Sequence, residues 1–146
     1  MSTKFPVSPY ENLHGLVYFR RMIDKIRLHA DGQLGEDYIP NLGQAFDHRC
    51  CLLLEVNYEE LAAIVRSGLS DEDIWNWVVR QGKAPTEEQI EVWNGFMTKR
   101  GWRDEVTSTL QRRLKEGGFE KRTDIQTMFD YIDLDEGRAL RSTPLP

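Results

Sequence analysis

Cationic and aromatic side chains concentrate in the segment from about Leu13 to Ala30, whose apolar periodicity predicts one long helix. Five polar side chains share one stripe of that helix, at separations of three or four residues: His14, Tyr18, Arg21, Lys25 and His29. Guanidinium, ammonium and imidazole donors bind phosphate and carboxylate groups, and imidazole titrates near neutral pH. The stripe therefore predicts a binding surface for a small anionic ligand or for an acidic segment of a partner protein.

Two further features of this helix bear on that interpretation. Asp24 lies between Arg20 and Arg27, at a spacing that can orient both guanidinium groups. Arg21 and Lys25 are like charges four residues apart, an unfavourable placement that a ligand or an acidic segment would relieve. The alternative is a solvated helix face with ordinary ion pairs, each worth about 0.2–0.5 kcal/mol.

The loop after this helix supplies a second set of candidates. It contains Asp37, Tyr38, Asn41, Gln44, Asp47, His48 and Arg49. Asp24 and Tyr38 join the candidate ligand-binding residues. Asp47 and His48 could act as acid and base, so a small-molecule enzyme is an alternative to a non-catalytic binding module. Asp47 also precedes the apolar run Cys50–Leu54, where an aspartate is a favourable helix N-cap.

Familiar signatures of metal and nucleotide sites are absent from the sequence. The histidines show no HExxH spacing, and Cys50 and Cys51 are adjacent rather than separated as in a CxxC pair. The carboxylates between residues 130 and 136 lack the spacing of a calcium loop and predict an exposed helix end. No GxxxxGK[ST], GxGxxG or GxSxG motif occurs. We expect no metal and no cofactor, and we interpret the two cysteines as reduced, buried thiols.

Helix-capping signals recur downstream of these candidates. Four capping residues stand three positions before an acid or an amide: Asn57, Ser70, Thr86 and Thr123. Glycines at 68, 82 and 101 fall where the corresponding helices should end. Gly95 lies inside an expected helix, where it costs about 1 kcal/mol relative to alanine, and we expect another helix to approach closely there.

Apolar residues recur with helical spacing throughout the chain, and no segment alternates convincingly as a strand would. We therefore predict an all-α fold without a sheet. It is a single domain, residues 1–146, of six or seven short helices, with loosely packed ends at residues 1–9 and 138–146. The expected core comprises ten residues: Phe19, Ile23, Leu53, Leu61, Val78, Trp93, Phe96, Leu110, Met128 and Phe129.

The overall charge argues against a dedicated nucleic-acid binder, because 19 Lys and Arg stand against 24 Asp and Glu, a net charge of −5. Bases concentrate in residues 14–30 and 99–122, and the simplest expectation is that they pair with acids of the same molecule. We expect nucleic-acid binding no tighter than the nonspecific level of roughly 10⁻⁴ to 10⁻⁶ M. No stretch approaches the roughly 20 apolar residues of a membrane span, and the first residues contain no secretory signal, so we expect a cytoplasmic protein.

Four long segments carry a family resemblance: HGLVYFRRMIDKIRLHADGQL, NLGQAFDHRCC, EEQIEVWNGFMTKRGWRDE and DIQTMFDYIDLDEGR. Through them the chain resembles a bacterial family known as domain of unknown function 5069, over most of residues 12–138. The resemblance implies a compact bacterial cytoplasmic domain. It implies no particular activity, cofactor or catalytic residue, so the chemical expectations above rest on the residues alone.

Overall fold

The computed structural model describes residues 3–141. In order, the elements of this part are β1 (Asn12–Leu13), β2 (Leu16–Val17), α1 (Phe19–Ala30), the 3₁₀ helix η1 (Glu36–Asn41), α2 (Phe46–Leu54), α3 (Tyr58–Arg66), α4 (Asp71–Gln81), α5 (Glu87–Lys99), α6 (Thr107–Glu116) and α7 (Met128–Asp135). Seven α-helices in the described residues confirm the predicted class of fold.

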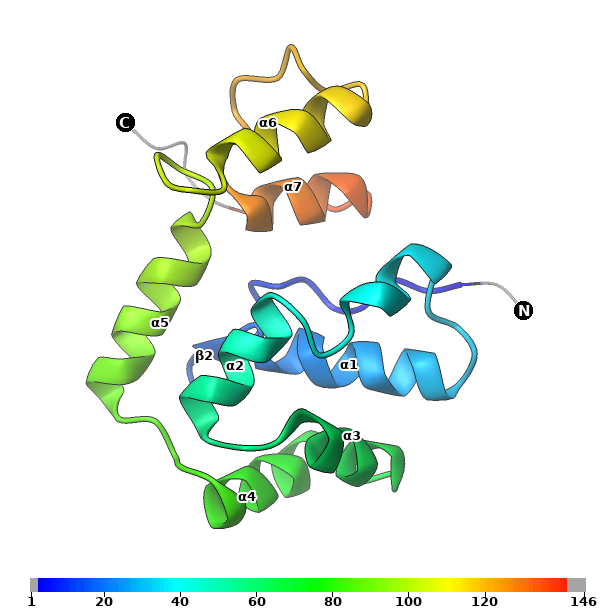
Figure 1. Ribbon diagram of the computed structural model, residues 1–146, viewed down its shortest axis with the longest axis vertical. Helices are drawn as coiled ribbons and strands as arrows, with labels where there is room; N and C mark the ends of the chain where they lie inside the picture. Colours follow the sequence, from blue (N-terminus) through cyan, green and yellow to red (C-terminus); the bar gives the residue numbers. More distant parts are fainter. Residues whose placement is uncertain (1–2, 142–146) are drawn as a thin grey trace.

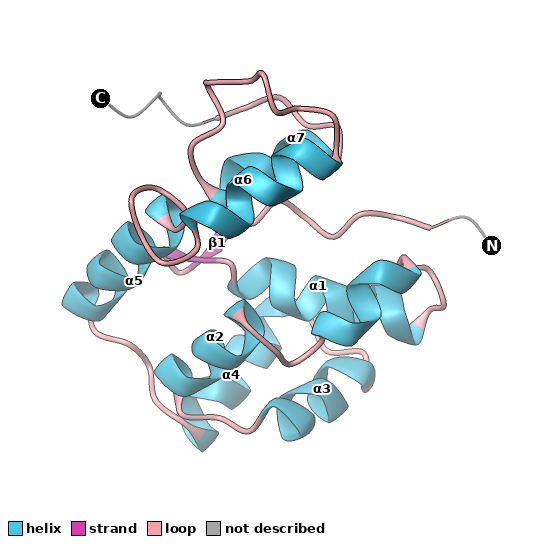
Figure 2. Cartoon of the chain, turned by 45° about the horizontal axis from the view of Figure 1, so that its top comes forward, coloured by secondary structure: helices cyan, strands magenta, loops and turns pink. Residues whose placement is uncertain are grey.

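Helix α1 lies in the middle of the molecule (Figure 1). Helices α2, α3 and α4 cover one side of it, and α5 runs along the edge from the level of α4 to the pair α6 and α7. Figure 2 shows that pair lying together above α1 and α2. The chain thus places the η1 loop, α2, α6 and α7 around the α1 stripe whose polar residues the sequence singled out.

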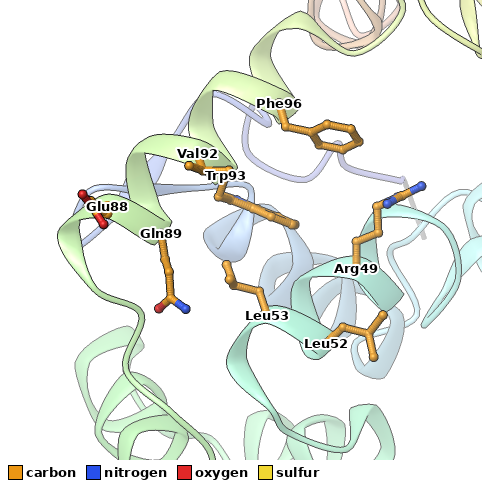
Figure 3. A pocket seen from close by; sticks show the side chains of 8 residues that line it. All are labelled: Arg49, Leu52, Leu53, Glu88, Gln89, Val92, Trp93 and Phe96. Atoms are coloured by element: carbon orange, nitrogen blue, oxygen red, sulfur yellow. The ribbon is translucent and has the colours of Figure 1, made fainter.

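Two clusters of buried side chains make up the core. The larger one surrounds Phe19 and Ile23 of α1 and includes side chains from α2 to α5 and Phe129 of α7. The smaller one lies between α6 and α7, around Leu110 and Leu114. Eight of the ten predicted core residues are buried. Leu53 is only partly buried, and the prediction for Phe96 was wrong, because its ring is 38% exposed in an open surface between α5 and α2 (Figure 3).

The prediction of a sheet-free fold needs one correction at the start of the long helix. Residues 12–17 form a small antiparallel hairpin, in which Asn12 pairs with Val17 and Leu13 with Leu16. Its turn residues, His14 and Gly15, both have positive φ (51° and 84°), as tight hairpins require. Asn94 of α5 binds both Gly15 and Val17 through its side-chain amide, at 2.7 and 3.1 Å. These hydrogen bonds hold residues 12–17 in the hairpin, although their apolar periodicity favours a helix. Helix α1 therefore begins only at Phe19.

Three predicted helix starts are confirmed. The side chains of Asn57, Ser70 and Thr86 each accept a hydrogen bond from the backbone three residues on, and Thr86 forms a complete capping box with Gln89. The prediction for Thr123 was wrong, because Thr127 caps α7 and accepts from Asp130 N. Thr127 also stands three residues before an acid, Asp130, and the backbone there is fixed by a hydrogen bond from Met128 N to Arg100 O.

The described parts of both chain ends are packed more tightly than predicted. Pro6, Ser8 and Pro9 are buried, and Arg138 donates a hydrogen bond to the carbonyl of Pro6. Ser8 also donates a hydrogen bond to Asp133 of α7 at 3.0 Å. The N-terminal segment is therefore hydrogen-bonded both to α7 and to the residues that follow it. Residues 1–2 and 142–146 of the predicted loose ends lie outside the described residues.

The glycine inside α5 does not mark a close contact within the chain. A Cβ atom at Gly95 would meet no heavy atom within 4 Å, so the predicted approach of another helix was wrong for the described residues. The cysteine prediction is confirmed, since Cys50 and Cys51 are free and buried. No helix in the described part of the chain is long and apolar enough to cross a membrane.

Candidate ligand-binding site

Arg21 of α1 is buried against the carboxylate of Glu136, just beyond α7. Its guanidinium donates two parallel hydrogen bonds to Glu136, at 2.9 and 2.7 Å, and a third to the carbonyl of Val7 at 3.1 Å. Tyr38 of η1 donates to the same carboxylate at 2.6 Å, and Arg138 lies 2.5 Å from its other oxygen. The pair of Arg21 and Glu136 therefore joins four segments of the chain, around residues 7, 21, 38 and 136–138.

Lys25, one turn further along α1, is buried against Asp47 of α2. The Lys25 Nζ lies 2.8 Å from Asp47 Oδ1 and donates to the hydroxyl of Tyr18 at 3.0 Å. Tyr18 in turn donates to Asp47 at 2.6 Å, and the backbone N–H of Gly43 donates to the second carboxylate oxygen at 3.0 Å. These contacts satisfy the carboxylate with one cation and two neutral donors.

Burial and charge shift the pKa values of these groups in different directions. Burial lowers the pKa of Lys25, although the Asp47 carboxylate opposes this shift. Burial, together with the charge of Asp47, raises the pKa of the Tyr18 phenol well above its ordinary value. Burial alone would raise the pKa of Glu136, but hydrogen bonds and the charge of Arg21 outweigh it and leave this pKa lowered. Tyr18 is therefore held neutral and Glu136 ionised at neutral pH.

These residues form one wall of a cavity of about 690 Å³. The cavity lies between α1, η1, α2, α6 and α7, and its walls also include Asp37, Asn41, Gln44, Ala45, Phe46, Arg49, Arg100, Val106, Thr109, Arg113, Glu116, Met128, Tyr131, Ile132 and Asp135. Among residues 3–141, Arg49 and Arg113 form no ion pair, whereas Arg100 pairs with Asp104 and Glu105. The cavity thus offers tyrosine hydroxyls, amides and two guanidinium groups that form no ion pair within the described residues.

The backbone is strained at two points on the cavity wall. Tyr18 has φ 78° and Ala45 has φ 49°, in a region that non-glycine residues seldom occupy. Both residues are close to Asp47. The Tyr18 hydroxyl donates a hydrogen bond to the Asp47 carboxylate, and Ala45 directly precedes α2, the helix that contains Asp47. Strain of about 1–3 kcal/mol per residue often accumulates at binding and catalytic sites.

Sequence comparison places the chain in a family. The family model described as a domain of unknown function (DUF5069) matches residues 3–138. The chain belongs to the DUF5069 family. No curated protein sequence matches it.

The DUF5069 chain brings together four of the seven predicted ligand-binding residues: Tyr18, Arg21, Lys25 and Tyr38 line the cavity. The other three lie elsewhere. His14 is in the hairpin turn, where it stacks on Trp75 and contacts Glu72 at 2.8 Å. His29 is exposed near the end of α1, and Asp24 accepts a hydrogen bond from Val7 N. The single predicted stripe is therefore divided, because the hairpin replaces the first helical turns.

The arginines beside Asp24 have a different partner from the one expected. Arg20 and Arg27 both contact Asp71 at the start of α4, at 3.2 and 2.7 Å. This pairing agrees with the expectation that the bases of residues 14–30 pair with acids of the same molecule. It leaves Asp24 free of both guanidinium groups and available to the N-terminal segment.

The structure corrects the N-cap interpretation of Asp47, whereas its role as an acid or base stays a prediction. Ala45, not Asp47, is the N-cap of α2, and the Asp47 carboxylate is fully buried. His48 is exposed on the neighbouring position of the helix, and no hydrogen bond joins the two side chains. Consecutive helical side chains diverge by about 100°, which separates the proposed acid from its base.

Sequence reasoning missed the carboxylate that fixes Arg21. Residues 130–136 were expected to form an exposed helix end, yet Asp130, Asp133 and Glu136 are buried. The two cations at positions 21 and 25 could have predicted buried carboxylates elsewhere in the chain. If that face of α1 is buried, each cation needs a carboxylate, and acids at helical spacing in a mostly apolar segment are suitable partners.

Proposed function

We propose that the chain is a binding module that holds a small organic anion in the cavity beside α1. The observation that supports this best is the cavity-lining guanidinium group of Arg113, which has no ion-pair partner in the described part of the chain. A carboxylate or phosphate is the natural acceptor for such a fork of N–H donors. The cavity volume of about 690 Å³ lies within the usual range for small-molecule sites.

The roles of Arg21 and Lys25 differ in this proposal from those the sequence suggested. Both cations already have buried carboxylates, so neither needs a ligand to balance its charge. Their part is to hold the hydroxyls of Tyr18 and Tyr38 in the cavity wall. The anion itself is bound by Arg113 of α6.

The charge of the wall limits the class of ligand. Five bases line the cavity, Arg21, Lys25, Arg49, Arg100 and Arg113, against four acids, Asp37, Glu116, Asp135 and Glu136. Asp47, buried beside Lys25, brings the two signs into balance. A nearly neutral wall does not suit a multiply charged phosphate chain. We expect a singly charged or zwitterionic ligand, such as a carboxylate that also carries hydroxyl or amine groups.

A thermal-shift screen against carboxylated and phosphorylated metabolites tests the proposal. A ligand at about 100 times its dissociation constant should stabilise the fold by about 2.7 kcal/mol. Arg113→Met should abolish that shift. Arg112→Met is the matched control, because Arg112 is the neighbouring exposed residue of α6 and lies outside the cavity lining. The absence of any hit, or a hit that survives Arg113→Met, contradicts the proposal.

One observation keeps a catalytic alternative open. The Tyr18 hydroxyl, in a strained residue of the cavity wall, lies between Lys25 and Asp47 and could exchange a proton with a bound substrate. These residues replace the Asp47 and His48 pair of the original enzyme hypothesis. If a bound metabolite is chemically altered, and Tyr18→Phe stops that change while binding persists, the enzyme interpretation is favoured.

The remaining expectations about partners and location stay proposals. Weak nucleic-acid binding is supported by pairing inside the second basic segment, where Arg112 contacts Glu116 and Arg122 contacts Asp124. Fluorescence anisotropy with labelled oligonucleotides at two salt concentrations tests it, and sub-micromolar binding with a steep salt dependence contradicts it. The free, buried cysteines are consistent with a bacterial cytoplasmic location.

A further inference from the structure

A second concave surface lies between α2 and α5, on the side of Arg49 away from the buried ion pairs. This groove has a volume of about 510 Å³ (Figure 3). It is lined by Arg49, Leu52, Leu53, Glu88, Gln89, Val92, Trp93 and Phe96. Six large hydrophobic side chains are exposed in the described residues, and three of them lie here: Leu52 (64%), Val92 (72%) and Phe96 (38%). An apolar concentration of this kind marks an interaction surface.

The two helices that form the groove have more apolar surface than the core covers. The five consecutive apolar residues Cys50–Leu54 place apolar side chains on every side of the C-terminal half of α2. Leu54 is buried in the core, whereas Leu52 faces solvent. In α5, Trp93 and Met97 are buried, and Val92 and Phe96 form a second apolar row beside them. Leu52 and Val92 stay mostly exposed, and Phe96 contacts the guanidinium groups of Arg49 and Arg100.

Gly95 provides an independent observation on the same helix. It lies three residues after Val92, and apart from its two chain neighbours and the nearby backbone of α5, no described atom lies within 4 Å of the position its Cβ would occupy. A glycine in a helix interior costs about 1 kcal/mol, which nothing inside this chain explains. A helix of another molecule could approach α5 closely at this position.

The charges at the two ends of the groove are complementary to each other. Arg49 lies at one end, where its guanidinium carbon is 5.2 Å from the centre of the Phe96 ring. Glu88 lies toward the other end of α5, about 12 Å from Phe96 by the helical rise. Figure 3 shows the two charged side chains at opposite ends of the apolar lining. Neither has an ion-pair partner among the described residues.

We propose that a second copy of this chain covers the groove and forms a twofold symmetric dimer. A twofold axis across the groove reverses its direction, so that Arg49 of each copy meets Glu88 of the other while Leu52, Val92 and Phe96 pack at the centre. The chain thus supplies both halves of the charge pairing itself. The groove carries one charge of each sign, so the net charge of −5 does not oppose contact at this face.

Sedimentation velocity across about a hundredfold range of concentration tests the dimer. The expected mass rises from the 17.1 kDa of one chain toward twice that value. Val92→Glu should hold the protein at the lower mass throughout. Val79→Glu is the matched control, because Val79 is an exposed valine on α4 outside the groove, and this variant should dimerise as the unaltered chain does. A mass that stays at 17.1 kDa at every concentration overturns the proposal.

A charge exchange tests the twofold arrangement. Arg49→Glu and Glu88→Arg should each weaken dimerisation by about fivefold, because either change removes both symmetry-related, partly exposed ion pairs. The double variant restores the pairing with reversed signs and should regain the original dissociation constant. If the double variant loses as much dimer affinity as the two single variants together, the two residues do not meet and the arrangement is overturned. The Arg113 variant leaves the groove unchanged, so failure of ligand binding and failure of dimerisation are separable.

Discussion

Arg21 and Lys25 lie one turn apart on α1, and both are almost fully buried beside a carboxylate, yet their surroundings differ. Glu136 receives two hydrogen bonds from Arg21 and further contacts from Tyr38 and Arg138. Asp47 has a single cation, Lys25. One pair therefore belongs to a network of several charges across the molecule, and the other is a local contact between α1 and α2.

The difference shows how two buried cations on one helix can respond differently to the loss of a partner. A guanidinium stays protonated at any ordinary pH, so Arg21 without Glu136 is a buried charge that cannot be removed. A lysine can lose its proton when its surroundings disfavour the charge, and burial already lowers the pKa of Lys25. The Arg21 pair acts as a fixed clamp, whereas the Lys25 pair is open to titration.

The largest expected effect comes from Glu136→Gln. This change leaves the Arg21 guanidinium buried without a carboxylate, and we expect a loss of about 3–5 kcal/mol in the free energy of unfolding. Urea denaturation at pH 7 and at higher pH should give the same loss, because Arg21 cannot discharge. Glu72→Gln, which removes an exposed carboxylate beside His14, should cost less than about 1 kcal/mol. A small effect at Glu136 would mean that Arg138 and Tyr38 alone hold the network.

Asp47→Asn should have a smaller effect that depends on pH. Without the carboxylate, the folded-state pKa of Lys25 falls further below its unfolded value, and the charged form is disfavoured in the fold. The loss, about 2–3 kcal/mol at pH 7, is fully present below that folded-state pKa and disappears as pH rises toward the unfolded value. Urea denaturation between about pH 7 and pH 9.5, always against the unaltered chain at the same pH, measures it. A loss that stays constant would show that Lys25 keeps its proton.

Arg21→Lys tests the geometry of the clamp rather than its charge. A single ammonium cannot reproduce the two parallel bonds to Glu136 together with the bond to the carbonyl of Val7. We expect a loss of about 1–2 kcal/mol in thermal or chemical denaturation. The neighbouring Arg20→Lys, at a half-exposed arginine on Asp71, should change stability by about 0.5 kcal/mol or less. Equal effects at the two positions would argue against a special role for the fork.

The smallest effect is the contribution of Glu136 to acid stability. Its pKa lies below the ordinary value of 4.5 in the folded protein, so the unfolded chain binds more protons in this range. The stability that Glu136 contributes is present above that ordinary value and is lost as pH falls through the lowered folded-state pKa. The free energy of unfolding of Glu136→Gln should therefore depend less steeply on pH between about pH 5 and pH 3. Parallel slopes for the two proteins would contradict the lowered pKa.

Much of the helical framework could be predicted from local sequence. Asn57, Ser70 and Thr86 open their helices as expected, because an N-cap needs only its own side chain and the backbone three residues later. The hairpin at residues 12–17 could not be predicted in the same way. Its stability depends on Asn94, which lies more than seventy positions away and meets it only when α5 packs against the hairpin.

The candidate site was half predictable for a similar reason. Tyr18, Arg21, Lys25 and Tyr38 were identified by residue type and spacing, and all four line the cavity. Periodicity could not show that their face of α1 is covered, because a polar stripe has the same pattern whether water or a set of buried carboxylates satisfies it. The partners Asp47 and Glu136 come from separate helices, and only packing brings them to α1.

The sequence by itself determined the family, the all-α class, the boundaries of α3, α4 and α5 and the chemical types of the site residues, because these depend on interactions between near neighbours in the chain. Tertiary structure decided which cations are buried, which carboxylate each one meets and where cavity and groove open. The physical reason is that burial and pairing depend on distances between residues far apart in sequence. Arg21 and Glu136 are 115 positions apart, and no local pattern contains the 2.7 Å contact between them.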